Sequence, residues 1–119
     1  FWYVYLIYGL YYCLNIVTEN KDYPAAVLIR AVELLNKKEK SLRLASGPGK
    51  LCCYFKIDKS LNKTPAFGPR AKLYFEDIGL KIKPCQIVKS QRVGVDYAGE
   101  YKDKLWRFYF KDNYFVSKK

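Results

Sequence analysis

Two polar side chains stand within runs that are mostly apolar. Arg30 interrupts residues 25–34, and Asn15 interrupts a run of aromatic and β-branched residues. A charge or an amide in such surroundings must be hydrogen-bonded, paired with an opposite charge, or face a binding site. The structural alternatives are a buried salt bridge of Arg30 with Glu19 or Glu33 and a hydrogen bond from Asn15 to a turn. The functional alternative is that both side chains line a pocket.

The segment of residues 46–50, Ser-Gly-Pro-Gly-Lys, predicts the start of a helix. Ser46 can cap the first turn, and a proline there lacks only an N–H that would be unpaired in any case. The segment is not a P-loop, because Leu44 stands where the first glycine is required and Leu51 where a Ser or Thr binds magnesium. The helix start and the charge of Lys50 favour a phosphate-binding position, and a plain helix cap is the alternative.

An aromatic residue occupies the expected tip of a β-hairpin. Residues 1–8 and 10–18 are both rich in aromatic and β-branched side chains, and Tyr8 and Gly9 lie at the turn between them. A ring at the tip of a stiff hairpin can fill the gap left by a base that has been extruded from a duplex. The structural alternative is an edge hairpin that is covered by residues outside this sequence.

The remaining pattern predicts one domain of the α+β class. The 119 residues suffice for one core, and we expect a curved, mostly antiparallel sheet, a protruding β-hairpin and a few helices. A helix is expected over residues 46–57, and residues 25–34 form either a buried central strand or a short helix. Further strands are predicted within residues 71–77, 80–89, 91–100 and 105–110.

The charge balance of the chain favours an anionic partner. Lys and Arg number 22 against 11 Asp and Glu, so the formal net charge is +11, which suits nucleic acid or an anionic membrane surface. A basic protein without such a partner is the alternative. The 12 Tyr and 7 Phe suit base stacking and equally a β-rich core.

Two other classes of function are disfavoured. The four cysteines show no C-x-x-C spacing and the chain has no His, so a zinc site is not expected. We interpret the cysteines, which are Cys13, Cys52, Cys53 and Cys85, as reduced thiols. Residues 1–17 are apolar but shorter than the roughly 20 residues of a membrane span, so a strand is expected there and no membrane partner.

Several segments, taken in chain order, resemble the methylpurine (alkyladenine or 3-methyladenine) DNA glycosylases, a family of base-excision repair enzymes. The match is carried by YVYLIYGLYYCLNIVT, AAVLIRAVE, SGPGKLCCYFKIDKS, QRVGVDYAGEYKDKLWRFYF and FVSKK, which together cover most of the chain. The resemblance implies an enzyme that flips alkylated or deaminated purines out of duplex DNA. It hydrolyses the N-glycosidic bond without a metal or another cofactor.

The resemblance assigns parts in base flipping to residues of the hairpin. Tyr8 matches the tyrosine that enters the minor groove in place of the flipped nucleotide, and Leu10 and Tyr11 flank it against the DNA. Tyr5 matches an aromatic wall of the base pocket, where the ring face attracts an alkylated, cationic base. Asn15 matches the pocket amide that contacts the base and excludes the exocyclic amine of guanine.

Four further residues match positions around the reacting bond and the DNA backbone. Arg30 matches the arginine near the attacking water and the adjacent phosphate, and the main-chain carbonyl of Val93 matches another contact to that water. Lys50 and Lys59 match lysines that bind phosphates. The implied partner is double-stranded DNA with damaged purines, bound by a monomer in the bacterial cytoplasm or the eukaryotic nucleus.

The catalytic base is where the sequence departs from the family. That base is a glutamate in an E-x-E-A-Y stretch that precedes the hairpin, and no such stretch occurs in these 119 residues. Because a general base is needed to activate the water, we expect an N-terminally truncated chain without glycosylase activity of its own. A non-catalytic nucleic-acid-binding module is the alternative function.

Overall fold

The computed structural model describes residues 1–7, 9–18, 25–35, 43–93, 99 and 103–116. These residues fall into two compact units, Phe1–Asp77 and Ile78–Lys119. Each unit contains an antiparallel sheet, and the first unit also contains the one α-helix of the described residues. The predicted α+β class with mostly antiparallel strands is therefore confirmed, and the expectation of a single domain stays a prediction.

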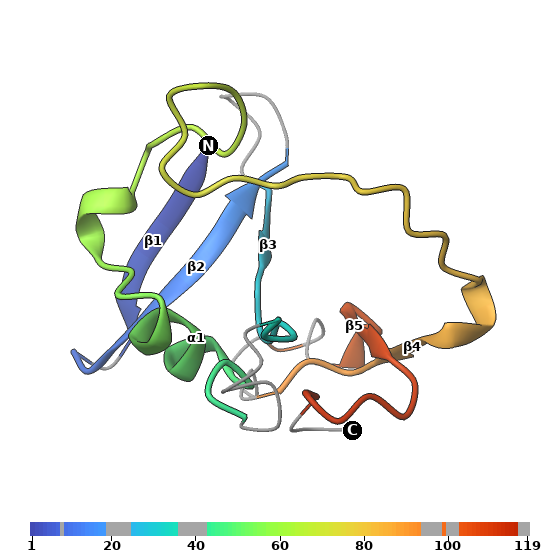
Figure 1. Cartoon of the computed structure of the whole chain (residues 1–119). Helices are drawn as coiled ribbons and strands as arrows, with labels where there is room; N and C mark the ends of the chain where they lie inside the picture. Colours follow the sequence, from blue (N-terminus) through green and yellow to red (C-terminus); the bar gives the residue numbers. More distant parts are fainter. Residues whose placement is uncertain (8, 19–24, 36–42, 94–98, 100–102, 117–119) are drawn as a thin grey trace. The chain divides into compact units, whose positions relative to one another are not determined.

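The sheet of the first unit has three antiparallel strands in the order β1-β2-β3 (Figure 1). They are β1 (Trp2–Ile7), β2 (Tyr11–Val17) and β3 (Ala26–Leu28). The first two strands confirm the predicted hairpin. Gly9 in the turn has a φ of +66°, a conformation that favours glycine, and the Leu10 N–H donates to the Ile7 carbonyl at 3.0 Å.

The apolar run of residues 25–34 contains less regular structure than its composition suggests. Only β3 is a strand, and it lies at the end of the sheet with its first two side chains exposed. The expectation of a buried central strand or a helix is therefore wrong. After β3 the chain continues to an isolated β-bridge between Ala31 and Ser46, which leads into the helix.

Helix α1 (Pro48–Tyr54) begins within the predicted segment, with Pro48 in its first turn as expected. The expected capping by Ser46 is wrong. Gly47 takes the N-cap position, and no side chain caps the helix. Ser46 forms the β-bridge with Ala31 instead, and its buried hydroxyl has no hydrogen-bond partner among the described residues.

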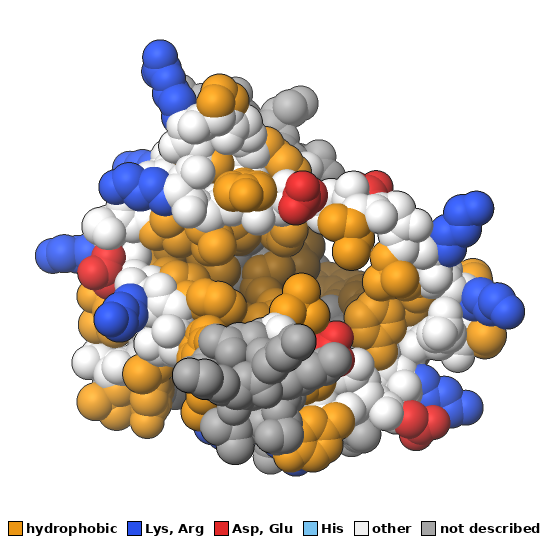
Figure 2. Space-filling view, in the orientation of Figure 1, with side chains coloured by type: hydrophobic (Ala, Val, Ile, Leu, Met, Phe, Trp, Pro, Cys, Tyr) orange, Lys and Arg blue, Asp and Glu red, His pale blue; other side chains and the backbone are white. Residues whose placement is uncertain are grey.

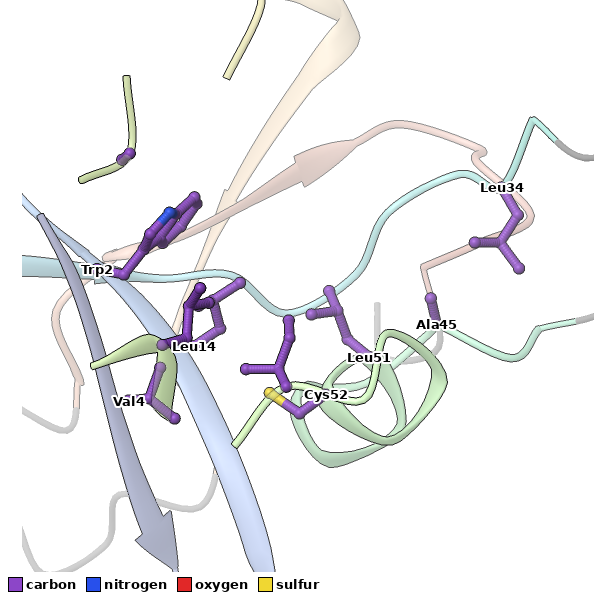
Figure 3. Close-up of a cluster of buried hydrophobic side chains, with 10 residues drawn as sticks. Trp2, Val4, Leu14, Leu34, Ala45, Leu51 and Cys52 are labelled. Carbon is purple, nitrogen blue, oxygen red and sulfur yellow. The ribbon is translucent and has the colours of Figure 1, made fainter. Parts of the chain in front are cut away.

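The core of the first unit joins the hairpin to the helix. Trp2 and Val4 of β1 and Leu14 of β2 are buried with Leu51 and Cys52 of α1 (Figure 3). The other buried members of the cluster are Leu34, Ala45, Ile57, Leu61 and Ala66. Burial of each large apolar side chain contributes about 1.5–3 kcal/mol, so this cluster holds α1 against the hairpin.

The outer edge of β1 is partly covered by residues that follow the 3-10 helix η1 (Lys59–Leu61). The Trp2 N–H donates to the Thr64 carbonyl at 2.9 Å, and Asn62 Oδ1 accepts a hydrogen bond from the Val4 N–H at 3.0 Å. These bonds fix η1 beside the hairpin, because they engage backbone groups that an edge strand otherwise leaves unpaired.

Residues 71–77 form no strand, contrary to the sequence prediction. They are held by separate contacts. The Trp2 indole donates to the Leu73 carbonyl at 2.8 Å, and the Phe75 N–H donates to the Ala66 carbonyl at 3.2 Å. A strand requires a continuous ladder of backbone partners, which the described residues do not supply for this segment.

The second unit contains a two-stranded antiparallel sheet. Its elements are the 3-10 helix η2 (Pro84–Gln86), β4 (Ile87–Ser90) and β5 (Arg107–Phe110). The strand predicted at residues 105–110 is confirmed in its last four residues. The strand predicted at residues 80–89 is wrong in its first part, because Pro84 lacks an N–H and begins η2. Residues 91–93 form no strand, and residues 94–98 lie outside the described part of the chain.

Candidate functional site

The register of the β1–β2 hairpin places two cross-strand pairs on one face, with the pair of Ile7 and Tyr11 next to them near the turn. Tyr3 pairs with Asn15, and Tyr5 pairs with Cys13. Paired residues of neighbouring strands project to the same side of a sheet, and alternate residues of one strand share a face. We call the surface formed by Tyr3, Tyr5, Cys13 and Asn15 the tyrosine face. It contains both residues that the sequence assigned to a base pocket, Tyr5 and Asn15.

Two rings supply the aromatic part of the tyrosine face. The ring centroids of Tyr3 and Tyr5 lie 5.2 Å apart, with an angle of 43° between the ring planes. Tyr3 is exposed and Tyr5 is half-buried, so ring surface is accessible on this face. A ring face in this position suits a flat or cationic aromatic ligand.

Asn15 is buried in the centre of the sheet. Its side chain is 6% exposed, and Nδ2 donates to the carbonyls of Tyr3 at 3.3 Å and Cys13 at 3.4 Å. The partners are strand carbonyls, so the expectation of a bond to a turn is wrong. Both bonds use the amide nitrogen, which leaves Oδ1 as the acceptor atom of the amide.

Arg30 acts electrostatically on the same face. Burial raises the pKa of the Cys13 thiol, and the positive charge of Arg30 opposes this by lowering the pKa. The guanidinium therefore lies close enough to favour negative charge beside the tyrosine face. Arg30 itself is half-buried just after β3. Of its two proposed salt-bridge partners, Glu33 is exposed and Glu19 lies outside the described residues.

A second buried thiol comes from α1. Burial raises the pKa of Cys52 to about 11, the nearby Cys13 thiol adds to the increase, and a hydrogen bond to the Leu14 backbone opposes it. Both thiols are therefore protonated at neutral pH. Since the thiolate is the nucleophilic form, neither cysteine is suited to nucleophilic catalysis here.

The end of the hairpin presents apolar side chains. Leu10 is 72% exposed and Tyr11 is 58% exposed. The Tyr11 side chain also packs against α1, since a Cβ on Gly49 would lie 3.1–3.2 Å from its atoms. Tyr8 lies outside the described residues. The part that the sequence assigned to Tyr8, Leu10 and Tyr11 in contacting DNA stays a prediction.

The remaining predicted residues lie on three different elements. Lys50 is the third residue of α1 and is exposed, and Lys59 is the first residue of η1 and is also exposed. Val93 is half-buried and belongs to the second unit. Tyr5 and Asn15 thus share the tyrosine face, and the charge of Arg30 acts on Cys13 of the same face. The parts assigned to all of these residues, to the two lysines and to Val93 stay predictions.

Sequence reasoning overlooked Tyr3 and Cys13. Side chains alternate between the two faces of a strand, so the pattern that places Tyr5 on this face also places Tyr3 there. The position of Tyr3 could therefore have been predicted from the sequence. Cys13 was interpreted only as one of four reduced thiols. Its position beside Arg30 follows from how the chain continues after β3, and no local pattern encodes that.

The part of the chain that the structure describes contains no group of three or more His, Cys, Asp or Glu side chains arranged to hold a metal ion. None of its helices is long and apolar enough to cross a membrane.

Comparisons with known proteins agree with the sequence motifs. The sequence model of the family described as methylpurine-DNA glycosylase matches residues 1–114. Proteins named as 3-methyladenine DNA glycosylases in Bdellovibrio bacteriovorus and Methanocella arvoryzae are 47% and 50% identical to this chain, and each match covers 98% of this chain and 62% of the relative. One from Clostridium perfringens is 42% identical, with 98% of this chain and 65% of the relative covered.

This chain belongs to the methylpurine-DNA glycosylase family, because the family model and these relatives match nearly its whole length. The resemblance found in the sequence is confirmed. The chain spans 62–65% of the length of these curated relatives.

Proposed function

From this family membership we propose that the chain supplies the base pocket and the DNA-contacting hairpin of a DNA repair glycosylase. The substrate is double-stranded DNA that carries an alkylated or deaminated purine. The enzyme flips this purine out of the duplex and hydrolyses its N-glycosidic bond. The names of the relatives point to 3-methyladenine as the first substrate to test.

The tyrosine face receives the flipped base. An alkylated purine often carries a positive charge, which the ring face of Tyr5 attracts. Asn15 contributes Oδ1 as an acceptor, because its Nδ2 is engaged by the strand carbonyls of Tyr3 and Cys13. An amide held in this way discriminates between bases by the hydrogen-bond donors that they present, since an unpaired polar group in the pocket is costly.

Arg30 stabilises negative charge next to the pocket. The charge of Arg30 lowers the pKa of the Cys13 thiol, which supports a positive electrostatic potential at the tyrosine face. In the proposed reaction the guanidinium binds the phosphate beside the flipped nucleotide and helps to position the attacking water.

The hairpin end and two lysines hold the DNA. Tyr8 occupies the space of the extruded nucleotide, and the exposed Leu10 and Tyr11 side chains contact the neighbouring bases. Lys50 and Lys59 neutralise phosphates, which positions the duplex without selecting its sequence.

The chain alone is proposed to be inactive. The water needs a general base of suitable pKa within hydrogen-bond reach, and the tyrosine face consists of two phenols, a thiol and an amide. Burial raises the pKa of the Cys13 thiol and keeps it protonated, an amide does not accept a proton, and none of the four groups is a carboxylate such as the family uses. In the active protein the base therefore has to come from outside this face.

The observation that carries the proposal is the placement of Tyr5, Asn15 and the field of Arg30 at one face of the hairpin. The test joins this chain to the part of the Bdellovibrio relative that lies outside the matched region. We expect the chimaera to release 3-methyladenine from methylated duplex DNA, and the unjoined chain to release none. Arg30→Ala in the chimaera should slow release by about a hundredfold.

The matched control is Arg70→Ala, which removes an exposed arginine elsewhere in the same unit and should leave release unchanged. A chimaera that is folded by circular dichroism yet releases no methylated purine, under conditions where the intact relative does, would contradict the proposal. Release by the unjoined chain would contradict its inactivity.

A further inference from the structure

The sheet of the second unit has an inverted distribution of polar and apolar side chains. In the register of β4 and β5, Ile87 pairs with Phe110 and Lys89 pairs with Phe108, so these four side chains share one face. Phe108 is 59% exposed, and Ile87 and Phe110 are 40% and 42% exposed. The charged residue of β5, Arg107, is instead only 8% exposed.

The Arg107 guanidinium has hydrogen-bond partners and an aromatic ring beside it on the opposite face. Its Nε donates to the Gln91 carbonyl at 2.9 Å, Nη2 donates to Ser90 Oγ at 3.2 Å, and its guanidinium lies 4.8 Å from the centre of the Tyr109 ring. These contacts hold the Arg107 side chain on the face opposite to Ile87, Phe108 and Phe110. The inversion is therefore fixed by the fold, because a shift by one residue would break every one of these contacts.

The exposed face is too apolar for a surface that stays in water. Among the described residues of the second unit, only Arg107 and Phe115 are buried, so the unit has almost no core of its own. Contiguous exposed apolar side chains mark a surface that something else covers. Figure 2 shows that hydrophobic side chains also reach the surface elsewhere on the viewed face of the molecule.

The length of the relatives supplies a candidate for what covers it. This chain spans only 62–65% of the curated relatives, so the same fold in those proteins includes a further segment of more than a third of their length. We propose that the face formed by Ile87, Phe108 and Phe110 is the docking site for that segment, which buries the two phenylalanine rings as core residues.

Nucleic acid is a weaker candidate for this face. Surfaces that stack bases combine aromatic rings with cations beside them. Both arginines of the unit make cation–π contacts with aromatic rings of the same unit. Arg92 lies 5.2 Å from the centre of the Trp106 ring, and Arg107 lies over the Tyr109 ring. Lys89 is the only cation in the four-residue face, so an apolar polypeptide surface is the better match.

The test uses this chain co-expressed with the remaining part of the Bdellovibrio relative as a separate, tagged polypeptide. A photo-reactive benzoylphenylalanine replaces Phe108 in one variant and Tyr109 in the matched control, whose side chain projects to the other face. We expect cross-links from position 108 to the tagged segment and few or none from position 109. Phe108→Glu should weaken binding of the segment at least about tenfold, and Lys104→Glu, an exposed control, should not.

Other outcomes would overturn the inference. Cross-links from position 108 to a second copy of this chain, or to duplex DNA added in a parallel sample, would assign the face to a different partner. Equal cross-linking from positions 108 and 109, or none from either, would show that the segment does not dock here. The cross-linking result does not depend on catalysis, so it can fail while the proposed function stands.

Discussion

At the scale of single residues, burial decides the chemistry of the two thiols near the tyrosine face. Cys13 lies on β2 and Cys52 on α1, and desolvation is the largest cause of the raised pKa of each. Cys53, the next residue of the helix, is exposed instead. The helix thus turns one thiol into the core and its neighbour towards solvent, which gives a matched pair for experiment.

The raised pKa of Cys52 predicts a loss of stability at high pH. The folded-state pKa of about 11 lies above the ordinary thiol pKa of 9.0, so folding favours the neutral thiol. This stabilisation is complete below pH 9 and is lost as the pH rises towards 11. The free energy of unfolding, measured with urea across this range, should fall more steeply for the chain than for Cys52→Ala. Cys53→Ala should behave like the unaltered chain, and equal slopes for all three would contradict the burial argument.

At the scale of secondary structure, the contact between α1 and β2 depends on a glycine. A Cβ on Gly49 would lie 3.1 Å from Cδ1 and 3.2 Å from Cβ of Tyr11. The ring can rotate away, but the Tyr11 Cβ is fixed to the strand backbone. Gly49 is therefore needed for the close approach of helix and strand, although glycine is a poor helix former.

Gly49→Ala should destabilise the chain by about 1 kcal/mol. Alanine normally improves an exposed helix position by about 1 kcal/mol, but overpacking at a close contact costs about 1–3 kcal/mol. Urea unfolding of a double-mutant cycle with Tyr11→Gly measures the coupling between the two sites. In that background, which lacks the clashing atoms, Gly49→Ala should be stabilising. A stabilising effect of Gly49→Ala in the unaltered chain would show that α1 does not pack this closely.

The elements that were predicted well are those that local residues determine. The β1–β2 hairpin follows from alternating side chains around a glycine with positive φ, and Pro48 marks the start of α1. Residues 71–77 have a suitable composition for a strand but lack a neighbouring ladder, which is a property of the tertiary structure. Ser46 was predicted as a cap from its type, but the bridge to Ala31 determines its place.

The candidate site shows the same division. Asn15 and Arg30 were found because each conflicts with an apolar run, and Tyr5 was found through the family motif. The strand carbonyls that hold Asn15 could not be predicted, because they depend on the register between two strands. The influence of Arg30 on Cys13 likewise depends on the path of the chain after β3.

At the scale of the whole molecule, the net charge of +11 predicts that the proposed binding to duplex DNA depends on salt. Each phosphate that a lysine or arginine neutralises releases condensed counterions, so the logarithm of the affinity falls linearly with the logarithm of the salt concentration. The slope of this line counts the phosphate contacts. Replacing a residue that binds a phosphate reduces the slope, whereas replacing a residue that inserts between bases leaves it unchanged.

Replacing both proposed phosphate ligands should reduce this slope in proportion to the number of contacts that are lost. Lys50→Ala with Lys59→Ala should weaken binding to all duplexes alike and reduce the slope by about 2 units, one for each lost contact. Fluorescence anisotropy between roughly 50 and 200 mM salt measures it. A matched pair, Lys104→Ala with Lys111→Ala, removes two exposed lysines to which no contact is assigned. If both pairs reduce the slope equally, Lys50 and Lys59 have no special part in binding.

The most direct test of the account is the preference of this chain for a duplex with an extruded or missing base. Its affinity for a duplex that carries an abasic-site analogue should be compared with its affinity for the same duplex undamaged, at one salt concentration. We expect tighter binding to the abasic duplex, and we expect Leu10→Ser, at a side chain that is 72% exposed, to reduce that preference without unfolding the chain. Equal affinity for both duplexes, with the same dependence on salt, would identify a general nucleic-acid-binding module and contradict the proposed function.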